Sequence, residues 1–365
     1  MSTTALLFAA TAPGPLSLQN RIAMAPMTRS RAIGNVPNAT MRDYYQQRGD
    51  AGLVITEGTS PSPEGLGYAR IPGLFNQAQA DGWRDIASAV HGAGGRLVVQ
   101  LMHSGRIGHP LNLPGGSQMI GPSAIAAAGQ MWTDRDGMQD NGLPKAMTDL
   151  DLDRVREDFV AAARLAISAG ADGVELHAAN GYLLAQFLNP RSNVRDDRYG
   201  GSAENRQRYL LEVVDAVAAA IGSERVGVRL SPFNPFNDLA AGYDGEEAEL
   251  LDLVRQLAAG KIGYLHLIAT PGAVPISTVD AVRCNFPGTL ILAGDYDRAR
   301  AEADLVAGRA DVIAFGRPFI ANPDLVERLR DQLPLSAFDP DTLYSPGAGG
   351  YSDYPGYRAT AAAEA

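Results

Sequence analysis

The feature that most constrains the fold of this chain is a repeated alternation of short β-branched runs with longer helical stretches. Several runs are almost continuously apolar, such as Leu97-Val98-Val99. Strands of this composition are buried on both faces, which is typical of a parallel sheet covered by helices. The eight runs are 21–27, 52–57, 96–102, 173–179, 225–232, 264–269, 289–294 and 311–317.

The stretches between the runs show helical signals. Residues 151–169 carry apolar side chains at helical spacing and end at Gly170, a residue type favoured just after a helix. Residues 202–221 end in the same way at Gly222, and a last short helix is predicted for 324–333.

Eight strands separated by helices predict either a closed (β/α)8 barrel or a doubly wound open sheet, because both α/β folds show this alternation. The count of eight and the even composition favour a single TIM barrel over residues 1–358. The Ala-rich residues 359–365 are expected to form a frayed C-terminal tail. Residues 103–150 are too long for a plain connector, so we expect a long cover loop after strand three.

Composition excludes several classes of function. The 365 residues carry a formal net charge of −10 and no basic run, so we expect no binding to nucleic acid or to a membrane. Cys284 is the single cysteine, which rules out an internal disulfide and a cysteine-ligated cluster. A reducing, cytoplasmic location fits best. The apolar stretch 5–10 lacks preceding basic residues, which favours the first strand or turn of the fold over a secretion signal.

Polar residues at the C-terminal ends of the strands mark the expected site, since TIM barrels place their chemistry there. Glycines end runs seven and eight, where barrels bind phosphate through backbone amides and a cation. An arginine inside run five is costly to bury unless it is paired, and it suits the electron-rich edge of a cofactor ring. The glutamine in run three can donate and accept hydrogen bonds at such an edge. These residues are Gly294, Asp295, Gly316, Arg317, Arg229 and Gln100.

The segment after run four is the strongest candidate for catalysis. His177 and Asn180 can both donate a hydrogen bond to one oxygen, which would stabilise negative charge developing on it. Tyr182 is a weak acid that can protonate a strongly basic carbon. A histidine or tyrosine alone is more often structural, but three such groups within six residues favour a site.

Other chemistries lack a signal in the sequence. The five histidines are scattered without a metal-binding spacing, so no metal is expected. Neither a Gly-x-Ser-x-Gly elbow nor a Walker loop occurs. The dinucleotide fingerprint is also missing, so a nicotinamide would be a co-substrate that binds and leaves.

The motifs of the chain resemble those of the old yellow enzymes, and in particular the bacterial FMN-dependent group that reduces enones and nitro compounds. Almost the whole chain takes part in the resemblance. The matching motifs are residues 20–28, Gln100-Leu101, residues 177–188, residues 193–206, Phe315-Gly316-Arg317 and residues 350–355.

The resemblance implies non-covalent FMN, reduced by NADH or NADPH, which passes a hydride to the β-carbon of an unsaturated carbonyl or nitro compound. Tyr182 would be the proton donor, and His177 and Asn180 would bind the substrate oxygen. The implied flavin-ring contacts are Pro26, Met27, Thr28, Gly58, Gln100 and Arg229. The implied phosphate contacts are Gly294, Asp295, Gly316 and Arg317, and the implied substrate pocket also includes Tyr68, Met102 and Tyr351.

Two positions depart from the family pattern. Met102 stands where many members have Trp, and a flexible thioether should enlarge or soften that wall. Asp295 stands where relatives have a neutral residue, and its carboxylate would repel a phosphate.

The alternatives are a nitroester or nitroaromatic reductase that uses the same site, a flavin-binding barrel without catalysis, and a phosphosugar-type barrel without flavin. The sequence does not distinguish NADH from NADPH, or a monomer from a homodimer.

Overall fold

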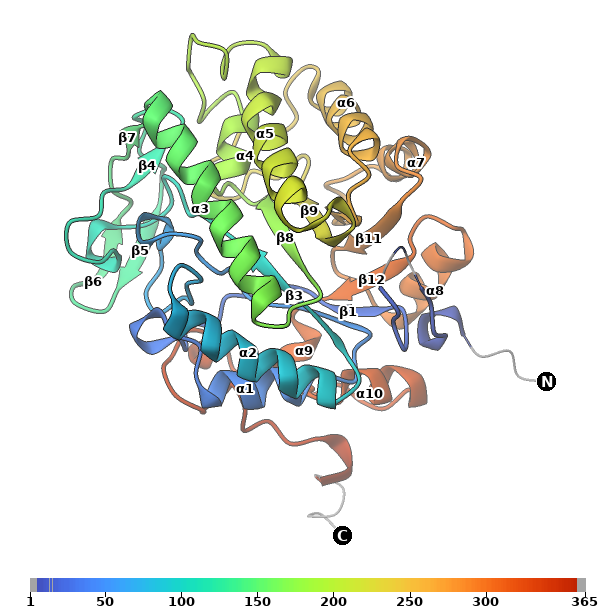
Figure 1. The fold of residues 1–365 in the computed structure, drawn as a ribbon. Coiled ribbons are helices and arrows are strands. Elements are labelled where there is room, and N and C mark those ends of the chain that lie inside the picture. Colours follow the sequence, from blue (N-terminus) through green and yellow to red (C-terminus); the bar gives the residue numbers. More distant parts are fainter. Residues whose placement is uncertain (1–4, 13, 15, 360–365) are drawn as a thin grey trace.

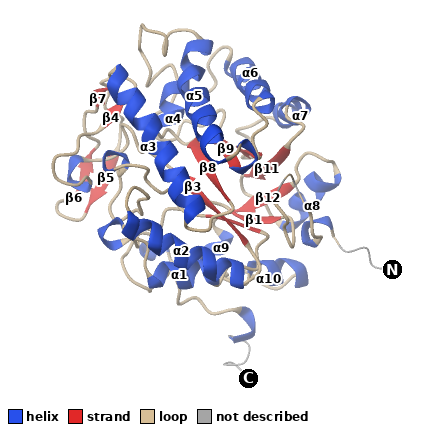
Figure 2. Ribbon diagram, viewed as in Figure 1, coloured by secondary structure: helices blue, strands red, loops and turns tan. Residues whose placement is uncertain are grey.

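The computed structural model describes residues 5–12, 14 and 16–359, and its centre is a closed barrel of eight parallel strands (Figures 1 and 2). β1 pairs with both β12 and β2 and so closes the barrel. The predicted (β/α)8 barrel is therefore confirmed. In barrel order the strands are β1 (Ile22–Met24), β12 (Val312–Phe315), β11 (Thr289–Ala293), β10 (Tyr264–Ile268), β9 (Val226–Leu230), β8 (Gly173–Ala178), β3 (Arg96–Leu101) and β2 (Leu53–Ile55).

The strands end earlier than the apolar runs of the sequence. β1 ends at Met24, and the following loop contains Pro26, which has no N–H to continue the hydrogen-bond ladder. Glu57, Met102 and Arg317, the last residues of three other runs, likewise lie in loops. The ends of the runs thus supply the rim of the barrel, where the sequence places the candidate site.

Helices cover the outside of the barrel (Figure 1). The helices predicted at 151–169, 202–221 and 324–333 are confirmed to within two residues at each end. α3 starts earlier than predicted because Thr148 and Asp151 form a capping box. The helices are α1 (Ala39–Gln46), α2 (Gln77–Gly92), α3 (Asp149–Ser168), α4 (Leu183–Leu188), α5 (Ala203–Ile221), α6 (Glu246–Ala259), α7 (Ile276–Asn285), α8 (Arg298–Val306), α9 (Pro318–Ala321) and α10 (Leu325–Asp331).

The segment between β3 and α3 is more ordered than the single loop that we expected. β4 (Ile120–Gly121) pairs with β7 (Lys145–Ala146), and β5 (Gln130–Thr133) forms a hairpin with β6 (Gly137–Asp140). Alternating burial along β5 shows that one face of this hairpin packs on the protein. The segment is therefore a small folded cover beside the barrel, visible as the teal strands in Figure 1.

The ends of the chain are described in part. The apolar stretch 5–10 forms a short 3-10 helix at Leu6–Phe8, not a strand, and the N–H groups of Leu6 and Leu7 donate to the Glu302 carboxylate. Of the expected C-terminal tail, residues 360–365 lie outside the described residues. Within the part of the chain that the structure describes, every helix is too short or too polar to cross a membrane.

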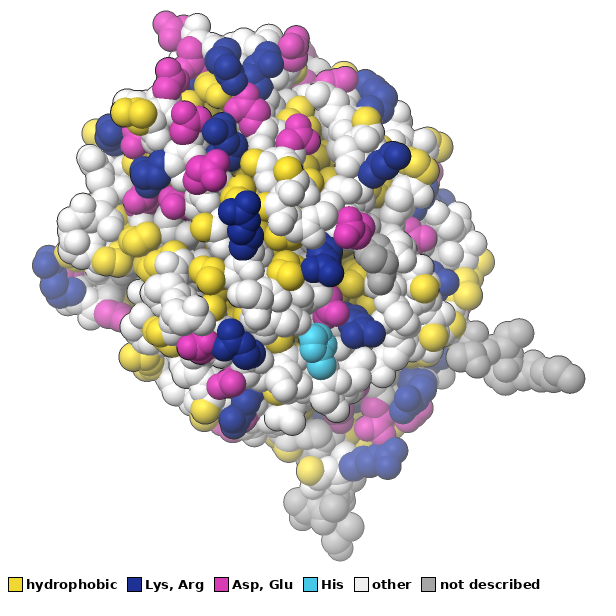
Figure 3. All heavy atoms as spheres, viewed as in Figure 1, with side chains coloured by type: hydrophobic (Ala, Val, Ile, Leu, Met, Phe, Trp, Pro, Cys, Tyr) yellow, Lys and Arg dark blue, Asp and Glu magenta, His cyan; other side chains and the backbone are white. Residues whose placement is uncertain are grey.

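Charge is divided unevenly between the surface and the interior. Arg29, Arg31, Arg48 and Arg106 are among the largest fully buried side chains. Their burial removes positive charge from a surface that is already acidic in composition. On the face drawn in Figure 3, acidic and basic side chains are interspersed, so that face carries no broad patch of one sign.

The inside of the barrel has an apolar part and a polar part. Alternate residues of a strand face inward, and those of β1, β2, β11 and β12 are apolar and join one buried cluster. The inward residues of β3, β8, β9 and β10 continue the same alternation but include buried polar side chains. These are Gln100, Glu175, His177, Arg229, Tyr264 and His266.

Gly227 on β9 provides the space for one of these polar side chains. A methyl group at Gly227 would lie 2.1 to 2.6 Å from ring atoms of Tyr264 on the neighbouring strand. We expect Gly227→Ala to lower the free energy of unfolding by about 1–3 kcal/mol, the usual cost of overpacking a core. Urea denaturation measures this. Gly92→Ala in α2, where a methyl group would meet nothing within 4 Å, is the control; equal effects would contradict the prediction.

Candidate active site

A buried carboxylate forms the floor of the candidate site. Glu175 on β8 accepts hydrogen bonds from Gln100 Nε2 at 2.7 Å, Tyr264 Oη at 3.0 Å and His266 Nδ1 at 2.9 Å. Burial acts to raise the pKa of Glu175, but His266, through its charge and hydrogen bond, and the Arg229 charge lower it below its usual value. Glu175 is therefore an anion on β8 that joins side chains of β3 and β10.

Arg229, which lies on the neighbouring strand, is a buried cation whose Nε has no hydrogen-bond acceptor among the described residues. The side chain is 7% exposed. Burial lowers the pKa of Arg229, whereas Glu175 raises it. A buried arginine normally needs an acceptor. The donors of Arg229 therefore fit the electron-rich edge of a bound cofactor ring such as that of FMN.

His177 is placed to donate a hydrogen bond from one defined ring nitrogen. It follows Glu175 on the inward face of β8 and lies opposite Arg229 in the strand register. Its Nδ1 accepts the N–H of Ala179 at 3.3 Å, so the ring proton resides on Nε2. Burial, and then the charges of Arg229 and His266, hold the pKa of His177 well below its usual value. His177 is thus a neutral Nε2–H donor.

Neighbouring residues also orient the side-chain amide of Asn180, as they orient the ring of His177. Its backbone has a φ of 56° and donates its N–H to Ser231 Oγ at 2.8 Å. Asn234 Nδ2 donates to the Asn180 side-chain oxygen at 2.9 Å. The protein thus occupies the acceptor end of this amide and leaves its N–H end for a ligand. Sequence reasoning missed Asn234 and Ser231, which lie more than 50 residues further along the chain.

Tyr182 packs against His177 and shares a hydrogen bond with Tyr68. The two phenol oxygens are 2.9 Å apart, and the rings of Tyr182 and His177 meet edge to face at 4.8 Å between centroids. Burial raises the pKa of Tyr182 above its usual value, so the phenol keeps its proton at neutral pH. The structure therefore brings His177, Asn180, Tyr182 and Tyr68 together, as the sequence predicts.

The ends of β2 and β3 form a second wall. A methyl group at Gly58 would lie 2.5 Å from Met102 Sδ, so the two residues are in close contact. Met102 is buried in one cluster with Tyr182, and Tyr68 packs against that cluster. The wall beside the tyrosines is thus a thioether in contact with a glycine.

The loop after β1 is fixed by Glu57. Pro26, Met27 and Thr28 are half-buried in this loop, and the next N–H, that of Arg29, donates to Glu57 Oε2 at 3.2 Å. Glu57 thereby links the loop after β1 to the end of β2.

The expected phosphate end is built from glycine backbone. Gly294 has a φ of 124°, and a methyl group there would lie 2.7 Å from the Thr270 nitrogen, so only glycine fits. A methyl group at Gly316 would make only ordinary contacts, the nearest at 3.7 Å, so the space above this glycine is open to a ligand. Arg317 is exposed at the start of α9, and Asp295 is exposed next to Gly294.

Arg300 is a cation near this end that the sequence analysis did not single out. It donates to the carbonyl oxygens of Gly294 and Ala269, the latter at 3.0 Å, and its guanidinium lies over the Tyr296 ring. These contacts fix the ends of β10 and β11 relative to each other. A pattern search would not find it, because Arg300 lies inside α8 and reaches back to the strands.

Tyr351 does not lie with the other pocket residues. Its ring is fully buried and stacks on Tyr44 with 3.9 Å between centroids. The arginines of the loop after β1 hold the surrounding segment: Arg29 donates to the Gly350 carbonyl at 2.6 Å and Arg31 to the Leu343 carbonyl at 2.6 Å. This packing corrects the expectation that Tyr351 lines the substrate pocket.

The aromatic residue of this segment that lies near the tyrosine pair is Tyr344, which is 59% exposed. Its phenol acts on the pKa values of Tyr68 and Tyr182 through space. The sequence gives two tyrosines in residues 344–351, and only the packing of the segment tells them apart.

A barrel with a buried cation above its floor and three converging donors at its rim defines a cofactor-binding enzyme. Residues 6–336 match the model of the NADH:flavin oxidoreductase / NADH oxidase family. The chain is 40% identical to a probable flavin mononucleotide-dependent alkene reductase of Leishmania infantum, over 94% of this chain and 95% of that protein. It is 39% identical to 12-oxophytodienoate reductase 1 of rice, Oryza sativa subsp. japonica, over 94% and 90%.

Solved structures agree with these relatives. Morphinone reductase in complex with tetrahydroNAD is 44% identical, with a TM-score of 0.91 over 96% of this chain and 97% of that one. The old yellow enzyme homologue of Zymomonas mobilis is 39% identical, with a TM-score of 0.91 over 96% and 99%. The chain belongs to the NADH:flavin oxidoreductase / NADH oxidase family, and the predicted old yellow enzyme relationship and FMN-dependent oxidoreductase class are confirmed.

Glu57 makes the stability of the site depend on pH. The groups that face it are Arg29, Arg31, Tyr45 and Tyr351, and burial, which outweighs the arginines, raises the pKa of Glu57 from 4.5 to about 7. Between these values the folded protein keeps a proton that the unfolded chain has released. The free energy of unfolding therefore falls as pH rises through this window, by on the order of 3 kcal/mol from this group.

We expect Glu57→Gln to remove this part of the pH dependence. Relative to the parent chain, the variant should gain stability from about pH 5 to about pH 8, because glutamine has no proton to release. Denaturant melts at the two pH values measure the change. Glu157→Gln on the exposed face of α3 is the control, and a constant difference between Glu57→Gln and the parent would contradict the prediction.

Proposed function

We propose that this chain is an FMN-dependent ene-reductase that reduces the carbon–carbon double bond of an α,β-unsaturated carbonyl or nitro compound. The observation that carries the proposal is the convergence of two oriented N–H donors, on His177 and Asn180, with the phenol of Tyr182. The alkene reductase and the morphinone and 12-oxophytodienoate reductases among its relatives support this class of reaction.

His177 and Asn180 bind the substrate oxygen. Both present N–H groups whose other ends are already occupied by the protein, so neither has to turn to meet the ligand. Donors that are fixed in advance stabilise negative charge developing on that oxygen more than water does. This pulls electron density from the double bond and makes its β-carbon electrophilic.

Tyr182 protonates the α-carbon. Its phenol is protonated at neutral pH and lies against His177. Bound FMN, kept reduced by NADH or NADPH, supplies the hydride for the β-carbon. When the α-carbon takes the proton, the O–H bond of Tyr182 breaks and a phenolate remains beside the hydroxyl of Tyr68, which can donate to it.

The residues that would hold FMN divide into two groups. Arg229 and Gln100 offer donors to the pyrimidine edge of the ring, and the loops after β1 and β2 offer glycine and main-chain contacts. The ring contacts proposed are Pro26, Met27, Thr28, Gly58, Gln100 and Arg229. The phosphate contacts proposed are Gly294, Asp295, Gly316 and Arg317, with the Asp295 side chain in solvent.

Tyr68, Met102 and Tyr344 are the proposed walls of the substrate pocket. Met102 in contact with Gly58 leaves the wall beside the tyrosines flexible. This favours substrates with a bulky group on that side.

FMN binding should depend on Arg229 more strongly than folding does. Arg229→Met removes a buried cation whose Nε has no acceptor in the described part of the chain, so the melting temperature of the apoprotein should fall little or rise. The dissociation constant for FMN should increase at least about tenfold, because charged hydrogen bonds are lost. Flavin fluorescence titration measures it, with exposed Arg255→Met as the control. A parent protein that stays colourless when FMN is added would overturn the proposed function.

Tyr182→Phe should separate the two half-reactions. Reduction of bound flavin by the nicotinamide needs no proton from Tyr182 and should keep its rate. Reoxidation by a simple enone should slow by on the order of a hundredfold, the usual contribution of a general acid. Stopped-flow absorbance under anaerobic conditions resolves the two steps, and enones and nitroesters tested side by side show which class is preferred. Loss of flavin binding in this variant would reject the assigned role.

A further inference from the structure

The loop between β9 and α6 carries Asn237, whose side chain contacts the segment that holds Asn180 and Tyr182. Asn237 Nδ2 donates to the backbone carbonyl oxygen of Asn180 at 2.8 Å. The same amide also acts on the phenols of Tyr68 and Tyr182, whose pKa values it lowers against the raising effect of burial. A single side chain is therefore hydrogen-bonded to Asn180 and lies close to both members of the tyrosine pair.

The backbone around Asn237 is held in a demanding conformation. Asn237 and Asp238 have φ values of 58° and 61°, which are uncommon for residues with side chains. A methyl group at Gly181, between Asn180 and Tyr182, would lie 2.7 Å from Asn237 Cβ. The two loops are thus in direct contact, and the glycine allows it.

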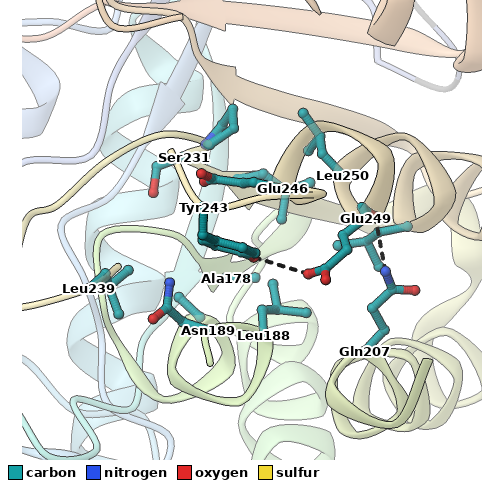
Figure 4. Close-up of a pocket in the computed structure, with 14 residues that line it drawn as sticks. Ala178, Leu188, Asn189, Gln207, Ser231, Leu239, Tyr243, Glu246, Glu249 and Leu250 are labelled. Carbon is teal, nitrogen blue, oxygen red and sulfur yellow. Dashed lines mark hydrogen bonds between the residues drawn. The ribbon is translucent and has the colours of Figure 1, made fainter. Parts of the chain in front are cut away.

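Polar contacts hold this loop above a small cavity. A small cavity lies behind the loop, lined by Ser231, Leu239, Tyr243 and side chains of α4, α5 and α6 (Figure 4). The cavity measures about 80 Å³. The cavity leaves part of the underside of the loop without packed neighbours, and hydrogen bonds from adjacent elements help to fix its position.

Those hydrogen bonds come from three sides. Asn189 of the chain after α4 pairs with both backbone groups of Ala240, at 2.8 and 3.1 Å. Glu246 at the start of α6 accepts the N–H groups of Phe233 and Gly242, at 2.7 and 2.6 Å.

The third contact comes from the cover segment. Arg106, which is fully buried, donates to the backbone oxygen of Asp238 at 2.6 Å and lies 3.4 Å from its carboxylate. Arg106 therefore fixes the backbone at Asp238, the residue next to Asn237.

We propose that Asn237 is a positioning residue for proton transfer, which holds the Tyr68–Tyr182 pair in register with Asn180. The inference rests on the proposed function, because it assigns Asn237 to the acid of that reaction. When Tyr182 gives its proton to the substrate carbon, its phenolate receives hydrogen bonds from the Tyr68 hydroxyl and the Asn237 amide. Both donors lie within the protein, so the charge left on Tyr182 is stabilised without water.

The test compares Asn237→Ala and the isosteric Asn237→Asp, which both remove the amide donor. We expect reoxidation of the reduced enzyme by an enone to slow about tenfold, with the flavin reduction rate and the dissociation constant for FMN unchanged. Asp244→Ala, an exposed change in the same loop, is the matched control and should behave as the parent. Equal slowing in both half-reactions would overturn the proposal.

A second measurement distinguishes positioning of the acid from general loosening of the site. The groups that face Tyr182 are Tyr68, His177, Arg229 and Tyr344. In isotope-labelled apoprotein the Tyr182 ring resonance, assigned with Tyr182→Phe, should titrate at higher pH in Asn237→Ala, because a donor to the phenolate is lost. An unchanged titration would overturn the proposal even if the enzyme is slow.

Double variants separate the failure of this inference from failure of the proposed function. In a Tyr182→Phe background, Asn237→Ala should slow reoxidation less than it does in the parent, because the acid it serves is already gone. An equal effect in both backgrounds would reject the role of Asn237 and leave that of Tyr182 intact. If Tyr182→Phe itself has no effect, the proposed function fails first.

Discussion

The buried charge of Glu175 is the constraint on which the site depends. A carboxylate inside a barrel is stable only if neighbouring groups donate to it, and here the donors come from β3 and β10. The negative charge in turn helps Arg229 to remain cationic in the interior, although its Nε has no hydrogen-bond partner among the described residues. Burial, and then the charge of Arg229, which lies opposite in the strand register, keep His177 neutral.

At the C-terminal end of the barrel, hydrogen bonds within the protein occupy the acceptor atoms of the polar side chains. Backbone N–H donation to His177 Nδ1 and side-chain donation to Asn180 Oδ1 leave the N–H donors of both side chains for the proposed substrate. The Tyr182 oxygen likewise has a partner within the protein, the hydroxyl of Tyr68. Orientation is thus achieved in the ground state, and little reorganisation is needed when charge develops.

The sequence predicts the barrel well because hydrophobic alternation is a local signal that each strand carries by itself. The three residues of the segment after β8 were also within reach, because they lie together along the chain. Asn237, Asn234 and Arg300 were not, since each acts through a loop or helix that only tertiary packing brings to the site. The tyrosine at 351 misled for the same reason: its motif is recognisable, but burial against Tyr44 decides its place.

The hydrogen bonds from Arg29 and Arg31 to residues 343–350 have a consequence for folding during synthesis. The two arginines are near the start of the chain, and the carbonyl groups they hold are more than 310 residues later. During synthesis the arginines therefore leave the ribosome long before their acceptors exist. The wall proposed for Tyr344 is completed last, after the donors of the barrel have been synthesised.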